Sequence, residues 1–132
     1  MSEIPERVRA TAPRALAAAF AVSGVAHFLR PETFAWMVPR WLPAPSALVY
    51  ASGAAELVCA AGLLLRRGWA GPASATLLLA LLPAHFQMTA DATERLKEPD
   101  ATRADRALAV IAWVRIPLQI PLIWAALQNR PR

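Results

Sequence analysis

The segment YASGAAELVCAAGLLL, residues 50–65, decides the fold because it is apolar throughout except for one carboxylate, Glu56. The chain has 132 residues, of which 57% are hydrophobic, and its mean hydropathy is +0.37. This composition is too apolar for a domain whose whole surface faces water. A helix needs roughly 20 apolar residues to cross a hydrocarbon core, so the longer run of residues 46–65 that contains this segment indicates an integral membrane protein.

Three other apolar segments accompany this one along the chain. Backbone polar groups in lipid must bond within their own segment, which favours helices over open sheets. We therefore predict an all-α protein, an integral membrane four-helix bundle that forms a single transmembrane domain over residues 1–132. The predicted helices cover residues 15–30, 46–65, 69–90 and 107–127. The short turn at Arg66, Arg67 and Gly68 should make the second and third helices antiparallel neighbours.

The connection between the first two helices, residues 31–45, is rich in proline and aromatic residues. Four prolines rule out a long helix there. Phe34, Met37, Val38 and Trp41 nevertheless recur at helical spacing, and aromatic rings favour the level of the lipid headgroups. We expect a short interfacial helical turn that caps the bundle with Trp36 and Trp41. An unstructured aromatic-rich loop is the alternative.

The charged residues lie mainly at the ends of the apolar segments. A net charge of +5 could indicate nucleic-acid binding, but the arginines form no patch with interleaved aromatic residues, so no nucleic-acid partner is expected. The single cysteine, Cys59, excludes an internal disulfide. Basic residues are almost equally divided between the two sides of the membrane. The uncompensated Arg66–Arg67 turn favours an orientation with the amino terminus inside.

A few polar residues interrupt the apolar segments and predict a binding pocket. Glu56 and Arg115 lie on helices of the same direction at depths that differ by about 3 Å. A lone charge in the bilayer is costly, so we expect these two residues to form an ion pair. Two histidines and an amide should lie in the half of the membrane that the aromatic segment caps. The predicted pocket comprises Glu56, Arg115, His27, His85, Gln119 and Gln87.

Other roles for these residues remain open from the sequence alone. The pair of Glu56 and Arg115 could fix helix register without any chemistry. The two histidines could form interhelical hydrogen bonds or contact headgroups, and axial ligation of a haem is a less favoured interpretation. We assign no catalytic residue and no metal site, because no nucleophile and base stand at a motif spacing.

Five motifs in order resemble the DoxX-like family of small four-helix membrane proteins: GVAHFLRP (24–31), VPRWLP (38–43), LVYASGAAELVCAAGLLL (48–65), PAHFQM (83–88) and WVRIPLQ (113–119). The resemblance covers nearly the whole chain. It implies a multi-pass protein of the bacterial cytoplasmic (inner) membrane, linked to a membrane redox system. The chain departs from the family pattern at His85, where asparagine would be expected.

The resemblance and the polar residues together predict an accessory subunit that binds a quinone or a lipid headgroup and has no catalytic activity of its own. A quinone is the one cofactor that this interpretation admits. The expected partners are membrane lipid, a redox partner protein and further copies of the chain in a homo-oligomer. A small proton-coupled transporter that acts as a dimer is the alternative. An enzyme that uses Glu56 or a histidine as acid or base is the third hypothesis.

Overall fold

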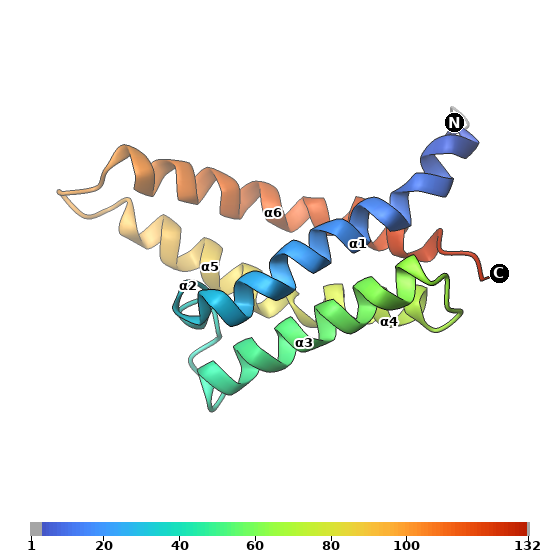
Figure 1. Ribbon diagram of the computed structural model, residues 1–132. Coiled ribbons are helices and arrows are strands. Elements are labelled where there is room, and N and C mark those ends of the chain that lie inside the picture. Colours follow the sequence, from blue (N-terminus) through green and yellow to red (C-terminus); the bar gives the residue numbers. More distant parts are fainter. Residues whose placement is uncertain (1–3, 132) are drawn as a thin grey trace.

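The computed structural model describes residues 4–131, and these residues form helices and turns without strands. Four of the helical spans are long and apolar enough to cross a membrane, which confirms the predicted all-α, multi-pass membrane architecture (Figure 1). The third span is one run that changes direction at Leu81. The helices are α1 (Glu6–Leu29), α2 (Pro31–Ala35), α3 (Pro45–Leu64), α4 (Ala70–Ala80), α5 (Leu82–Arg95) and α6 (Arg103–Leu127).

Three of these helices extend beyond the predicted bounds. α1 begins at Glu6 and not near residue 15, α5 continues to Arg95 and not only to residue 90, and α6 begins at Arg103 and not at residue 107. The added turns are rich in charged residues, which mark the membrane surface but do not end a helix. Arginine in particular is a good helix former, so helices continue into water past the end of the apolar run.

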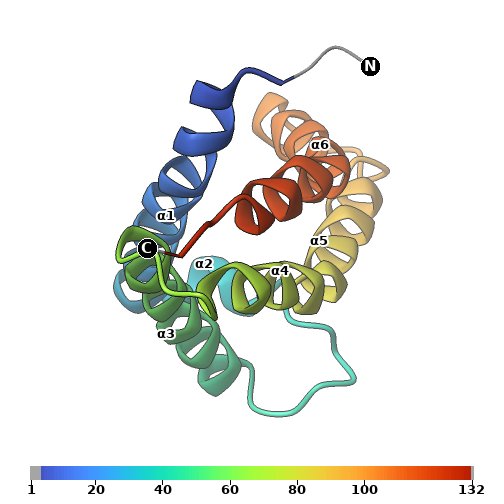
Figure 2. The ribbon, with the colours of Figure 1, turned by 90° about the vertical axis from the view of Figure 1, so that its right-hand side faces the viewer.

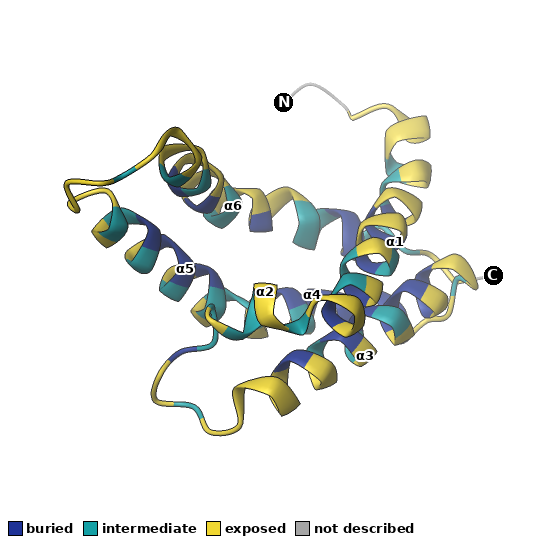
Figure 3. Cartoon of the chain, turned by 60° about the vertical axis from the view of Figure 1, so that its left-hand side comes forward, coloured by how far each residue is buried: buried dark blue, intermediate teal, exposed yellow. Residues whose placement is uncertain are grey.

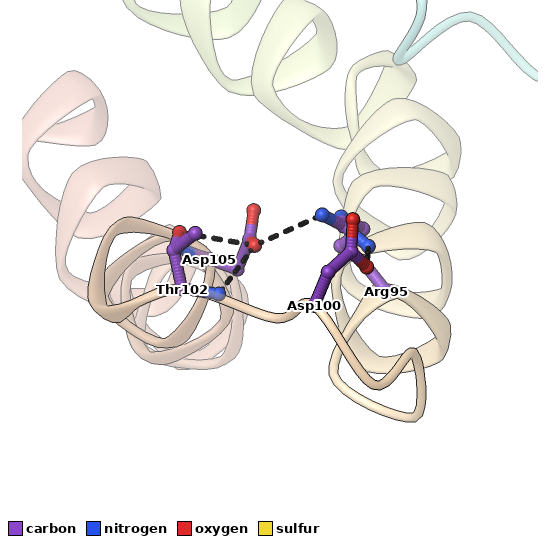
Figure 4. A network of polar contacts seen from close by, with 4 residues as sticks. All are labelled: Arg95, Asp100, Thr102 and Asp105. Carbon is purple, nitrogen blue, oxygen red and sulfur yellow. Dashed lines mark hydrogen bonds and ion pairs between the residues drawn. The ribbon is translucent and has the colours of Figure 1, made fainter.

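The start of α6 is fixed by a capping box at Thr102. The Thr102 hydroxyl accepts a hydrogen bond from the Asp105 backbone N–H, and the Asp105 carboxylate accepts one from the Thr102 backbone N–H. Arg95, at the end of α5, contacts Asp105 at 3.5 Å and donates to Asp100 at 2.7 Å (Figure 4). These contacts join the end of α5 to the start of α6 across the connection between them.

Seen end on, the helices follow one another in the order α1, α3, α4, α5 and α6, and α6 returns to pack on α1 (Figure 2). The closest packing joins α1 to α3. A Cβ atom built on Gly53 would lie 2.6 Å from the His27 Cβ and 3.2 Å from the Gly24 carbonyl oxygen. Small residues at this crossing therefore allow the two backbones to approach closely, as is usual between helices in lipid.

The buried residues form two apolar clusters rather than one. The larger cluster joins α1, α3, α4 and the end of α6, and we call this part of the molecule the terminal half. The smaller cluster, in which Met88, Ala92, Ala109 and Ala112 are buried, joins α5 to the beginning of α6, and we call it the hairpin half. The hairpin half diverges from α1 and α3, and its outer faces are exposed (Figure 3).

The aromatic connection contains a helix, but not where its spacing predicted one. α2 spans Pro31–Ala35, three residues before the predicted start at Phe34, and only single turns follow it. Proline is favourable at the first position of a helix, which explains the start at Pro31. Pro39 disfavours helical backbone at the residue before it, so the helix cannot continue to Trp41. The alternative of an unstructured loop is thus wrong for residues 31–35.

Candidate functional site

The most deeply buried charged residue, Glu56, is paired with a histidine. Glu56 Oε2 lies 3.4 Å from His27 Nδ1, and their side chains are 5% and 8% exposed. Glu56 lies on α3 and His27 near the end of α1, so the pair spans the crossing that Gly24 and Gly53 make possible. The contact is an ion pair when the imidazole is protonated.

His27 is held in place on two further sides. Its Nδ1 lies 2.6 Å from the Ser23 carbonyl oxygen, one helical turn earlier, and donates a hydrogen bond to it. The Phe34 ring of α2 stacks on the imidazole, with centroids 3.8 Å apart and planes inclined by 14°. Because Nδ1 carries a single hydrogen, Glu56 Oε2 is left without a hydrogen-bond partner. The short helix α2 therefore closes the site from the loop side.

Arg115 and Gln119, both on α6, form a second cluster of polar side chains. The guanidinium donates to Gln119 Oε1, one turn further along α6, and Gln119 Nε2 donates to the Leu78 carbonyl oxygen at 2.6 Å. That carbonyl lies next to the interruption at Leu81, and the Leu82 N–H, its partner in a continuous helix, does not bond it. The Gln119 amide therefore satisfies a backbone oxygen that the break in the third span leaves available.

His85 lies on α5 with no hydrogen-bond partner for either ring nitrogen within the described part of the chain. The residue is 9% exposed, and the charge of Arg115 is close enough to act on its ring. Thr89, one turn later, donates to the carbonyl oxygens of His85 and Ala112 and so joins α5 to α6. A buried histidine with two unpaired nitrogens calls for an explanation, since each unsatisfied polar atom is costly.

The predicted ion pair between Glu56 and Arg115 is wrong. No carboxylate oxygen of Glu56 lies within 4.0 Å of a guanidinium nitrogen of Arg115. Glu56 lies eleven residues from the start of α3 and Arg115 twelve from the start of α6. Depth does not determine which helices are neighbours, however, and α3 packs against α1 and α4. The buried pair exists, but His27 is the partner.

Gln87 does not belong to the pocket either. It donates to Asp91 Oδ1 at 3.0 Å, and the same oxygen accepts a hydrogen bond from Arg40 at 3.1 Å. These contacts anchor the aromatic connection to α5 at the membrane surface. Trp36 and Trp41, the two predicted caps, are 40% and 75% exposed. Phe34, on the same connection, makes the aromatic contact with His27 inside the bundle.

Several site groups could not be assigned from the sequence. Phe34 was noted only for its spacing, and the Leu78 carbonyl could not be anticipated as an acceptor for a side chain. Ser74, which is fully buried on α4 and whose hydroxyl has no partner among the described residues, lies beside Cys59 of α3. A serine among alanines gave little signal, because small residues are common at helix contacts in lipid.

The described residues contain no group of three or more His, Cys, Asp or Glu side chains placed to hold a metal ion. The polar side chains inside the bundle instead offer hydrogen-bonding groups, from four different helices. We call this the polar layer, and it consists of His27, Glu56, His85, Arg115 and Gln119.

Residues 16–130 match a family described as a domain of unknown function, DUF8561. The chain belongs to this family. The match covers the first candidate span from residue 16 onward, the other three spans completely, and every residue of the polar layer. No curated protein and no solved structure matches the chain.

Proposed function

We propose that this DUF8561 protein is an accessory subunit of a membrane redox system and binds a quinone in its polar layer. The observation that supports this proposal best is His85, whose two buried ring nitrogens have no partner in the described structure. An unpaired buried polar group costs about 1–3 kcal/mol, which a ligand with a hydrogen-bonding head would recover. A quinone carbonyl accepts from an imidazole N–H, and a quinol hydroxyl donates to an imidazole nitrogen.

The neighbouring groups suit the same ligand. Arg115 supplies a fixed positive charge for a carbonyl oxygen, and Glu56 Oε2 is a free acceptor for a quinol hydroxyl. The ligand tail would leave between the membrane helices, where apolar side chains face outward. The similarity of five sequence motifs to the DoxX-like family supports a redox setting in a bacterial cytoplasmic membrane. Electrons would then come from a partner protein, since a chain with a single cysteine cannot form and reduce an internal disulfide.

The proposal is tested by titrating the purified protein in nanodiscs with a short-chain quinone and following the quenching of tryptophan fluorescence. His85→Leu removes both ring nitrogens, and we expect it to weaken binding roughly tenfold, as the loss of one or two neutral hydrogen bonds would. Gln87→Leu serves as the matched control because Gln87 bonds Asp91, which is not part of the polar layer. Equal binding curves for the wild type and His85→Leu would refute the proposed site.

One observation favours the alternative of a proton-coupled transporter that acts as a dimer. The expected partner of Glu56, Arg115, carries a permanent charge, whereas the observed partner is the imidazole of His27. A carboxylate and an imidazole in contact inside a membrane are common elements of a proton relay. Proton uptake into proteoliposomes that Glu56→Gln abolishes and His85→Leu leaves intact would favour the transporter over the quinone-binding subunit.

A further inference from the structure

Four arginines gather around one cavity at the end of the bundle where both chain termini lie (Figure 1). The cavity has a volume of about 150 Å³ and is bounded by the first turns of α1 and by the ends of α3 and α6. Its lining includes the side chains of Arg9, Arg14, Arg66 and Arg130, and one carboxylate, Glu6. The cavity is therefore strongly positive, and its lining shares no residue with the polar layer.

Among residues 4–131, no ion pair neutralises the positive charge of this cavity. Across residues 4–131, the ion pairs involve His27, Arg40, Arg95 and Lys97, and none of the four cavity arginines. Arg9 is partly buried, and its Nε has no hydrogen-bond partner among these residues. Guanidinium groups that converge without a carboxylate partner are suited to an anion from outside the chain.

The cavity is also held in a fixed shape. The end of α3 closes in a Schellman motif, in which the N–H of Arg67 bonds the Gly62 carbonyl and the N–H of Arg66 bonds the Leu63 carbonyl. Arg66 takes the left-handed conformation of this motif, with φ of 54°, and its Nε donates to the Arg130 carbonyl oxygen at 3.0 Å. The carbonyl groups at the end of α3 are thus satisfied, and the guanidinium groups dominate the charge.

We propose that this cavity binds a phosphate group, supplied by the headgroup of an anionic phospholipid. Guanidinium groups bind phosphate oxygens in pairs, and the planar fork of arginine fits that geometry. The volume equals that of cavities that accept a benzene-sized molecule, which is enough for one phosphate. The cavity opens at the end of the membrane spans, where basic pockets between helices meet lipid headgroups.

The test measures lipid adducts of the full chain in detergent by native mass spectrometry with phosphatidylglycerol or phosphatidylcholine. A triple variant, Arg9→Gln/Arg66→Gln/Arg130→Gln, should bind phosphatidylglycerol roughly a hundredfold more weakly than the wild type. The matched control, Arg30→Gln/Arg103→Gln/Arg106→Gln, removes the same charge from the opposite membrane face and should bind as the wild type does. Phosphatidylcholine, which has no net charge, should bind all three proteins equally.

Inorganic phosphate distinguishes the two sources of the ligand. If the headgroup is recognised within the membrane, millimolar phosphate should leave the phosphatidylglycerol adduct in place. Complete displacement by phosphate would assign the cavity to a soluble phosphate compound and overturn the lipid as its source. Equal losses in the triple variant and the control would overturn the site itself.

A second set of variants guards against a folding defect in the triple variant. Replacing the same three residues by lysine keeps the charge and removes the guanidinium forks, so this protein should retain part of the binding. The single variant Arg130→Gln alters an exposed side chain near the carboxyl terminus and should fold normally. If Arg130→Gln folds and binds phosphatidylglycerol with unchanged affinity, and lysine fails to restore any binding, the proposal is wrong.

Discussion

The terminal half and the hairpin half use different means to hold their helices together. In the terminal half, eleven buried apolar residues pack in one cluster, and Gly24 and Gly53 bring α1 and α3 into close contact. In the hairpin half the apolar cluster has only four buried residues, three of them alanine. Its helices are joined by side-chain hydrogen bonds, from Thr89 to Ala112 and from Trp113 to Thr93.

This difference indicates where the molecule is rigid and where it can move. Close packing of small residues leaves little freedom, whereas a hairpin with few buried contacts opens at a low cost in free energy. The polar layer lies where the two halves meet, with His27 and Glu56 on one side and His85 and Arg115 on the other. Movement of the hairpin half would change the distance between these two pairs of residues.

The largest effect is expected from breaking the pair of His27 and Glu56. In His27→Leu the buried carboxylate loses its nearest charged partner, and the loss of one member of a buried pair typically costs about 3–5 kcal/mol. The double variant His27→Leu/Glu56→Leu should recover much of this loss, because no unpaired charge remains. Thermal unfolding in detergent measures all three proteins.

A matched double-mutant cycle pairs Glu56 with Arg115 and not with His27. Since no ion pair joins Glu56 to Arg115, their effects on the free energy of unfolding should be closer to additive than those of His27 and Glu56. A coupling energy that is larger for Arg115 than for His27 would contradict the arrangement of helices described above. It would also remove the physical basis for separating the two halves.

A smaller effect is expected from Gly53→Ala, which tests the packing of the terminal half. The added methyl group would lie 2.6 Å from the His27 Cβ and 3.2 Å from a backbone oxygen of α1. Such overpacking typically costs about 1–3 kcal/mol, and it should also separate His27 from Glu56. In the control, Gly68→Ala, the new Cβ lies 3.5 Å from Pro131, an ordinary contact. Equal melting temperatures for the two variants would show that α1 and α3 are not closely packed.

Much of the fold could be predicted because the membrane restricts it. The length of each apolar run predicts a helix, and counting from its end gives the depth of Glu56 or Arg115. The same counting gives no information about position in the plane of the membrane. Glu56 therefore received the wrong partner, because the order of helices around the bundle is a tertiary property.

The helix ends and the local bonds were also beyond the sequence patterns. The runs Asp91–Arg95 and Arg103–Arg106 are polar and were interpreted as loop, but a capping box and ion pairs continue both helices. The Leu78 carbonyl is available to Gln119 because the helix of the third span is interrupted at Leu81. Pro83 predicted a disturbance at that point, and the side chain that compensates for it came from a helix distant in sequence.

The smallest effect is expected at the tip of the hairpin half, in the ion pair of Arg95 and Asp100. The hydrogen bond and the charge of Arg95 hold the pKa of the Asp100 carboxyl below its usual range (Figure 4). A carboxyl whose pKa is lowered by folding stabilises the protein above its unfolded pKa of about 3.9, and this contribution is lost as the pH falls through the folded pKa. Asp100→Asn should therefore lower the melting temperature slightly at pH 7 and leave it unchanged well below pH 3.

The control is Glu98→Gln, which removes an acid of the same turn that makes no ion pair with the described residues. Melting temperatures measured between pH 3 and 7 should fall less steeply with acid in Asp100→Asn than in Glu98→Gln. Parallel curves for the two variants would mean that the surface pair adds nothing to stability, and that the buried contacts between α5 and α6 hold this half together.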